Sequence, residues 1–238
     1  MDLNRQDERA LYVREMFTRI AHRYDLMNRL MTAGQDQSWR RKAIARAALP
    51  VGGRILDLGA GTGDLALEAL RQYPGRAVVA ADFTQEMMRI GRSRFNQRRP
   101  FAAGPLWTAA DAYCLPFAGE SYEAVVSGFL LRNVADIHQA LAEQVRVLKP
   151  GGRWIALDTT QPRRSLLSPF VRLHLQFGIP ILGRLLTGQP DAYRYLPETT
   201  QRFLAAEQLA ARMADVGLKQ IGFQLFMLGT VAIHWGIK

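Results

Sequence analysis

Short apolar segments alternate with amphipathic ones through the middle of the chain, and this alternation restricts the fold more than any other feature. Strands are expected at 54–58, 77–81, 106–110, 123–127 and 154–157, and helices at 64–73, 85–96 and 136–148. Strands that alternate with helices form a parallel sheet covered by helices on both faces. Ligands of such α/β folds bind at the carboxyl ends of the strands, where the strand order reverses.

The segments on either side of this core follow other patterns. Apolar residues between 13 and 20 recur at helical spacing, and a second helix is expected at 35–48. Near the end of the chain, a helix at 200–216 precedes two strands that a short turn joins, which favours a hairpin. We predict one domain, 1–238, with a helical cap at 1–50, a core at 54–160, an insert at 162–190 and a C-terminal helix and hairpin at 191–238.

Composition indicates a globular protein with a basic surface. Of the 238 residues, 48% are hydrophobic and 22% are charged, enough for a sizeable core. No apolar stretch reaches the roughly 18 residues of a membrane-spanning helix. The first ten residues do not resemble a secretory signal, and Cys114 is the single cysteine. A cytoplasmic location is therefore expected.

A glycine-rich turn follows the first expected strand. It reads Asp57-Leu-Gly-Ala-Gly-Thr-Gly-Asp64, and its glycines let the backbone turn tightly and approach a ligand closely. A dinucleotide fingerprint requires a small residue three places after Gly61, where this chain has Asp64. Because a carboxylate would repel a pyrophosphate, the two acids favour a ligand that carries positive charge. The alternative is that both acids cap the turn and the helix after it.

Two more acids follow the next two strands. Asp82 stands 21 residues after Gly61, where a carboxylate can accept hydrogen bonds from both hydroxyls of a ribose. Asp111 and Ala112 follow the third strand, near the expected place of an adenine. Adenosine with a cationic tail describes S-adenosylmethionine, which we predict as the cofactor. The candidate cofactor-binding residues are Asp57, Gly59, Gly61, Thr62, Asp64, Asp82, Phe83, Asp111, Ala112, Ser127 and Gly128.

These acids and glycines resemble those of class I methyltransferases, and further motifs narrow the resemblance. Several runs are similar to signatures of the ubiquinone/menaquinone biosynthesis C-methyltransferases, the UbiE/MenG family. They are Met16-Phe17, Ile20-Ala21, Arg23-Tyr24-Asp25 with Asn28, Trp39-Arg40, Leu131–Val134, Arg146–Gly152, Tyr193–Leu196 and Val231–Gly236. The resemblance covers about residues 12–238, and the runs at 16–40 and 131–134 are its most specific parts.

The resemblance implies a Rossmann-like fold with a seven-stranded, mostly parallel sheet and an antiparallel last strand. It also implies methylation of a ring carbon of a polyprenyl quinol: demethylmenaquinol or the benzoquinol of the ubiquinone pathway. Arg132 would stabilise a developing quinolate oxygen, and Asn133 would orient a water. Tyr24 and Asp25 would fold over the cofactor. The proton acceptor is left open between a water held by Arg132, Asp25 and Asp158.

Three departures from the family pattern leave the acceptor open. The fifth strand ends Asp158-Thr-Thr-Gln-Pro162 where the family usually has Glu-Phe-Ser-x-Pro. Residues 197–200 replace Ala-Glu-Ser-Ile, and Leu130 stands where a glycine is common. A methyltransferase for another lipid or a secondary metabolite is therefore an alternative. For Arg132, the alternative to catalysis is a salt bridge to the helix that starts near Asp136.

The net charge of +10 suggests an anionic partner, which could be a nucleic acid, a membrane surface or an acidic substrate. The arginines do not form a nucleic-acid-binding arm, and no RNA-binding module is recognisable. We therefore expect no nucleic-acid partner, and keep an RNA-binding or nucleic-acid-modifying protein as the alternative of another class.

The insert at 162–190 combines many large apolar residues with four arginines and no acid. This composition is typical of an interfacial helix, so we predict a lid that takes the polyprenyl tail and contacts the membrane peripherally. An ordinary insert or a homodimer contact is the alternative. The four histidines show no metal-ligand spacing, and no metal is expected.

Overall fold

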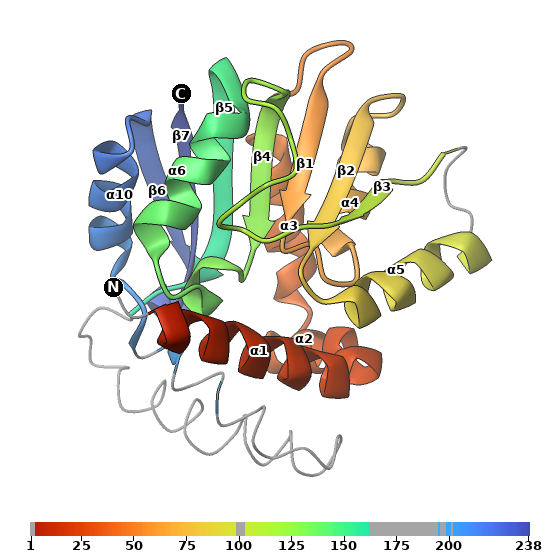
Figure 1. Cartoon of the computed structure of the whole chain (residues 1–238). Helices are drawn as coiled ribbons and strands as arrows, with labels where there is room; N and C mark the ends of the chain where they lie inside the picture. The colour runs from red at the N-terminus through yellow and green to blue at the C-terminus, as the bar shows by residue number, and fades with distance from the viewer. Residues whose placement is uncertain (1–2, 99–102, 162–194, 196–198, 201) are drawn as a thin grey trace.

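The computed structural model contains a seven-stranded sheet (Figure 1). It describes residues 3–98, 103–161, 195, 199–200 and 202–238. The strands are β1 (Arg54–Leu58), β2 (Ala77–Asp82), β3 (Leu106–Ala109), β4 (Tyr122–Gly128), β5 (Leu148–Thr159), β6 (Lys219–Phe226) and β7 (Val231–Ile237). Their order is β3-β2-β1-β4-β5-β7-β6, and β7 runs in the opposite direction to the other six strands.

This topology confirms the predicted fold class, including the parallel core and the antiparallel last strand. The order reverses beside β1, which pairs with β2 on one side and with β4 on the other. The hairpin prediction is also confirmed, since β6 and β7 pair directly. The carboxyl ends of β1 and β4 therefore form the opening where α/β proteins bind their ligands.

Helices cover both faces of the sheet. They are α1 (Leu3–Ile20), α2 (Tyr24–Met31), α3 (Gln35–Ala45), α4 (Asp64–Gln72), α5 (Gln85–Arg98), α6 (Ile137–Val147) and α10 (Ala206–Asp215), with short 3-10 turns η1 (Ala21–Arg23), η2 (Leu131–Asn133) and η4 (Met227–Gly229). Successive β1 residues serve different layers, because side chains alternate along a strand. Ile55 joins the apolar cluster of α3 and α4, and Leu56 joins that of α6 and α10.

The helical cap lies beside the carboxyl ends of the central strands, where α1 and α2 run across the edge of the sheet (Figure 1). It contains three helices where periodicity predicted two, because η1 turns the chain between α1 and α2. Ala21 of η1 is buried against Met87 and Ile90 of α5. The cap is thus fixed onto the core at its bend.

Several predicted boundaries were wrong. The helix expected at 35–48 ends at Ala45, and the strand expected at 154–157 spans Leu148–Thr159. The helix expected at 200–216 is interrupted: residues 199–200 and 202 are helical, and α10 begins at Ala206. Ala205 before it is extended (φ −64°, ψ 155°), and its N–H donates to Gln208 Oε1. The insert at 162–190 lies outside the described residues. No helix within the described part of the chain is long and apolar enough to cross a membrane.

Asp57 joins the sheet to the helix after the glycine turn. Its side chain is 1% exposed, and its Oδ2 accepts a hydrogen bond from the N–H of Ala66 in α4 at 2.9 Å. Its Oδ1 accepts none from the described residues. Burial, together with the nearby charge of Asp82, raises the pKa of this carboxyl to about 7, although the hydrogen bond from Ala66 lowers it. Because Asp57 accepts from an N–H in the first turn of α4, it fits the alternative expected from sequence, in which this acid caps the helix.

We expect Asp57 to make stability fall as the pH rises. Its pKa is about 7 in the folded protein and 3.8 in the unfolded chain, so the native state binds the extra proton. The free energy of unfolding should therefore decrease from about pH 4 to about pH 7 and level off above that. Asp57→Asn keeps an oxygen for the Ala66 N–H but cannot take up the proton. It should reduce the difference in unfolding free energy between about pH 4 and about pH 7 by on the order of a few kcal/mol.

Denaturant unfolding near pH 5 and near pH 8 measures the slope. Asp111→Asn, a change at an exposed acid, is the control and should leave the slope of the wild-type protein. An Asp57→Asn protein with the wild-type slope would contradict the expectation.

Candidate functional site

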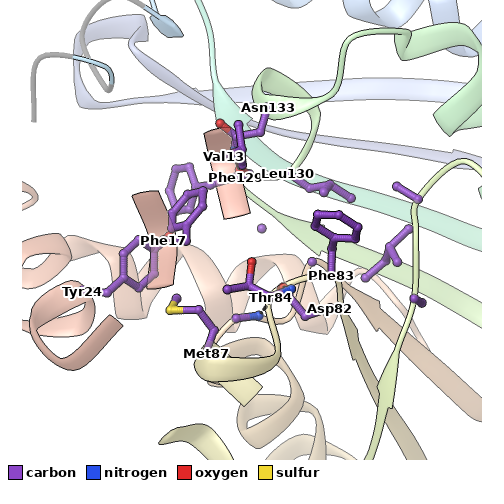
Figure 2. Close-up of a pocket in the computed structure, with 16 residues that line it drawn as sticks. Val13, Phe17, Tyr24, Asp82, Phe83, Thr84, Met87, Phe129, Leu130 and Asn133 are labelled. Atoms are coloured by element: carbon purple, nitrogen blue, oxygen red, sulfur yellow. Dashed lines mark hydrogen bonds between the residues drawn. The ribbon is translucent and has the colours of Figure 1, made fainter. Parts of the chain in front are cut away.

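A cavity opens at the carboxyl ends of β1, β2 and β4, beneath the cap (Figure 2). Its enclosed volume is small, about 100 Å³, and reaches about 600 Å³ when the space at its open mouth is counted. The cap contributes Val13, Phe17 and Tyr24 to its wall. The core contributes Leu58, Gly59, Gly61, Asp82, Phe83, Thr84, Met87, Ala110, Ala112, Gly128, Phe129, Leu130 and Asn133.

The glycine turn forms the floor of this cavity. Gly59 and Gly61 have φ values of +69° and +57°, in the left-handed region that favours glycine. The N–H groups of Gly59 and Ala60 both donate to the carbonyl of Ala81 in β2, at 2.8 and 3.0 Å. A Cβ on Gly61 would come within 3.3 Å of Met87 Cε. The bare backbone therefore leaves room for a ligand against the turn.

Asp82 holds the turn from the end of β2. Its Oδ2 accepts from the Gly61 N–H at 2.7 Å, and its Oδ1 accepts from the Thr84 N–H at 2.6 Å. Burial raises the pKa of this carboxyl, while the backbone hydrogen bonds oppose the change. The Thr84 hydroxyl and the Phe83 backbone N–H also donate hydrogen bonds that lower the pKa of Asp82. The neighbouring Phe83 is 40% exposed, and Figure 2 shows its ring at the cavity.

The structure separates the remaining cofactor candidates. Ala112 and Gly128 line the cavity, as Gly59 and Gly61 do. Ser127 is buried in β4 and lies outside the lining. Asp111 is exposed beside the lining residues and accepts from the Tyr113 N–H at 2.9 Å. Asp57, Thr62 and Asp64 lie behind the turn, with partners inside the protein.

Asp25, a catalytic candidate from sequence, is part of an internal charge cluster. Its Oδ1 accepts from the Thr62 hydroxyl at 2.7 Å, and its Oδ2 pairs with Arg94 of α5. Asp64 lies near the same arginine, with Arg94 Nη2 4.0 Å from its Oδ1. Burial, and then repulsion by Asp64, raise the pKa of Asp25. Asp25 thereby ties α2 of the cap to the glycine turn and to α5.

Arg40 extends the cluster into α3. Its Nη1 bonds Asp36 Oδ2 at 2.5 Å, and its Nε lies 3.7 Å from Asp64 Oδ2. Both partners of the first pair are buried. The acid at the third place of the fingerprint therefore faces two arginines of its own protein. Sequence reasoning did not assign Arg40 or Arg94 to the site, because their contacts with Asp64 and Asp25 join different elements.

Arg132 and Asp158 form a second buried pair at the ends of β4 and β5. Arg132 is 7% exposed. Its backbone N–H donates to Asp158 Oδ2 at 3.3 Å, and the Nε of its side chain lies 3.9 Å from Asp158 Oδ1. The guanidinium also lies over the Phe129 ring, with Cζ 5.2 Å from the centroid. Burial raises the pKa of Asp158 to about 6, although the Arg132 charge opposes this. From sequence, a salt bridge to the helix near Asp136 was the alternative role of Arg132. The structure pairs Arg132 with Asp158 instead.

Asn133 and Tyr24 face the cavity directly. The Asn133 amide donates to the Phe129 carbonyl at 2.8 Å, and its Oδ1 accepts from the Tyr195 hydroxyl at 3.3 Å. Burial raises the pKa of Tyr24, against the opposing effects of Arg132 and of a hydrogen bond to Asn28. Figure 2 shows Tyr24 and Asn133 on different sides of the cavity. Tyr24 and Asn133 are thus the two catalytic candidates that line it.

The cavity fits the predicted cofactor in two respects. The glycine turn offers a backbone surface that a Cβ would fill, and Asp82 offers carboxylate oxygens at the end of β2. Sequence reasoning missed Val13, Phe17, Thr84 and Met87 as wall residues, although the helical spacing of the first two marks an apolar face. Among the described residues, no group of three His, Cys, Asp or Glu side chains could hold a metal.

Solved structures of similar shape contain the same fold. The [4+2]-cyclase SpnF matches with a TM-score of 0.69 at 16% identity, covering 95% of this chain and 94% of that one. A SAM-dependent methyltransferase from Thermotoga maritima, described as a possible histamine N-methyltransferase, matches with a TM-score of 0.63 at 20% identity. That match covers 94% of this chain and 99% of the other. At these identities the likeness concerns the fold alone.

Sequence relatives are much closer. The ubiquinone/menaquinone biosynthesis C-methyltransferase UbiE of Desulfotalea psychrophila is 46% identical over 226 residues, 95% of this chain and 90% of that protein. The demethylmenaquinone methyltransferase of Roseiflexus castenholzii is 42% identical over 233 residues, 98% and 95% of the two chains. The ubiE/COQ5 methyltransferase family model matches residues 3–238. The chain therefore belongs to the ubiE/COQ5 methyltransferase family.

Proposed function

We propose that this protein is an S-adenosylmethionine-dependent C-methyltransferase that methylates a ring carbon of a polyprenyl quinol. The observation that carries the proposal is the position of Asn133 in the wall of the glycine-floored cavity, next to the buried Arg132–Asp158 pair. This arrangement supports the proposal, because Arg132 lies close to the wall of the glycine-floored cavity and could stabilise an oxygen anion there. The relatives named for demethylmenaquinone and for ubiquinone/menaquinone biosynthesis support the quinol as acceptor.

The reaction needs the methyl group of the cofactor to be aligned with the ring carbon of the quinol, and it releases one proton overall. The bound cofactor supplies a methyl group on a sulfonium, which is a good leaving group. The acceptor would lose a hydroxyl proton to form the quinolate, and its ring carbon would bond to the methyl group as the bond from that methyl to sulfur breaks. The ring carbon would then lose its proton to restore aromaticity and the oxygen would regain one, so the net loss is one proton. The protein must hold the reactants in line and favour the quinolate form of the acceptor.

Arg132 is proposed to stabilise the quinolate oxygen, because a fixed cation in a buried site acts strongly on developing charge. It is not the base, since a guanidinium stays protonated. Of the acids left open by the sequence, Asp25 is bound to Thr62 and Arg94, outside the cavity wall. Asp158 is the better candidate to accept the hydroxyl proton of the quinol, through a water, because it contacts Arg132, the residue proposed to stabilise the resulting oxygen anion.

The acceptor ring is the finer part of the proposal. We propose demethylmenaquinol first, with the benzoquinol of the ubiquinone pathway second, and a peripheral membrane contact as the source of either substrate. The test is incubation with methyl-labelled cofactor and a panel of demethylated naphthoquinols and benzoquinols, followed by mass analysis. If no labelled product formed from any naphthoquinol or benzoquinol of the panel, the proposed function would be contradicted.

We expect Asp82→Ala to weaken binding of S-adenosylhomocysteine by about tenfold or more. The change removes an acceptor for ribose hydroxyls and also the anchor of the Gly61 N–H, each worth roughly 1.5–3 kcal/mol. Calorimetry measures the affinity, and Glu86→Ala, at an acid that pairs with the exposed Arg89, is the control. Wild-type affinity in a folded Asp82→Ala protein would refute the assignment.

We expect Arg132→Ala to lower kcat by about 10²–10³ while changing cofactor affinity little. Because the change also leaves Asp158 buried without its cation, it should destabilise the fold. The double variant Arg132→Ala/Asp158→Ala removes both charges and should recover much of the stability without recovering turnover. If turnover returned together with stability, the role of Arg132 would be structural only.

We expect Asp25 and Arg94 to act together in fixing the cap. Asp25→Ala and Arg94→Ala should each raise the KM for the cofactor, and the double variant should add little, because both break one pair. Arg92→Ala, at an exposed arginine of the same helix, is the control. If Asp25→Asn abolished turnover while Arg94→Ala left it unchanged, Asp25 would be the base instead.

A further inference from the structure

A second cavity lies behind the wall that carries Arg132 and Asn133. Its lining includes Arg132, whereas the adjacent Asn133 lines the cofactor cavity. Tyr195 lines the second cavity too, and its hydroxyl reaches across to Asn133 Oδ1 at 3.3 Å. The two cavities therefore share a wall made of η2 and Tyr195. The two cavities are neighbours on either side of this wall.

The second cavity is apolar in most of its described lining. Leu131, Val134, Ala135, Ile137 and Phe203 supply the carbon surface. The other lining residues are Arg132, Tyr195, Thr199 and Arg202, and none of the described lining residues is an acid. Its volume is about 410 Å³, within the range of about 300–1,000 Å³ of small-molecule sites, which suits a small molecule or part of a longer one.

This chemistry selects among ligands. A cation would meet two arginines and no carboxylate in the described lining, and a sugar would leave its hydroxyls against apolar carbon. An extended hydrocarbon attached to an oxygen-bearing ring suits both parts of the wall. Its carbons would lie against Ile137 and Phe203, and its ring oxygen would lie toward Arg132.

We propose that this second cavity binds the first isoprenoid units of the quinol tail, while the ring sits at the shared wall beside Asn133. The proposal rests on the proposed function, because it assumes that the acceptor is a prenylated quinol. It makes Ile137, Ala135 and Val134 specificity-determining residues for the tail. None of these three lines the cofactor cavity, so changes there should leave cofactor binding intact.

The test fills the cavity from its apolar side. Ile137→Trp should lower kcat/KM for a demethylated naphthoquinol with a short prenyl tail by about tenfold or more, the scale on which apolar pockets discriminate by a few carbons. The same ring without a tail should be methylated within about twofold of the wild-type rate. His138→Trp, an exposed change on the next residue of α6, is the matched control. Ala135→Phe is the second variant, for use if Ile137→Trp fails to fold.

Two activity results would overturn the inference: equal losses with tailed and tail-less quinols, or no loss with either. If the wild-type protein methylates neither quinol, the proposed function fails, and calorimetric binding of the tailed quinone then tests the cavity by itself. Binding that Ile137→Trp abolishes and His138→Trp keeps would support the cavity. Equal binding by both variants would overturn it.

Discussion

The site depends on the hydrogen bonds that hold the glycine turn of one strand to the end of the next. The Ala81 carbonyl accepts from the N–H groups of Gly59 and Ala60, and Asp82 accepts from Gly61. These bonds require the parallel register in which Leu58 of β1 pairs with Ala81 of β2. A slip of one residue would turn Asp82 to the opposite face of the sheet. The register of two buried strands thus sets the shape of the cavity floor.

Charge at the site is mostly balanced inside the protein. Asp25 and Asp64 face Arg94, and Asp64 also faces Arg40. Because these acids are neutralised by neighbours, they offer a cationic ligand little net attraction. Asp82 differs, since its hydrogen-bond partners are neutral groups, mostly backbone N–H, and it lines the cavity. We therefore propose that selection of the cofactor depends on Asp82 and on the bare glycine backbone more than on the number of acids in the motif.

The sheet could be predicted from sequence because each strand carries its own local signal: a short apolar run followed by a turn or helix. The glycine turn and Asp82 were predictable for the same reason. The pairing of Arg132 with Asp158 was not, since it depends on the register in which Gly128 of β4 meets Leu157 of β5. The role of Asp25 was hidden likewise, because its partner Arg94 lies on a helix 69 residues away. Local patterns gave the elements, and long-range pairing decided what each charged residue does.

The aspartate at 158 changes how the buried arginine is held. It stands where the resemblance leads one to expect a glutamate, whose side chain is one methylene longer. The shorter side chain leaves 3.9 Å between its Oδ1 and Arg132 Nε, beyond a hydrogen bond, while Oδ1 also accepts from the Thr159 N–H at 2.7 Å. Backbone donors therefore take much of the carboxylate, and its contact with Arg132 Nε is an ion pair without a hydrogen bond. Under the proposed function, the charge of Arg132 would stabilise an oxygen anion at the wall beside Asn133.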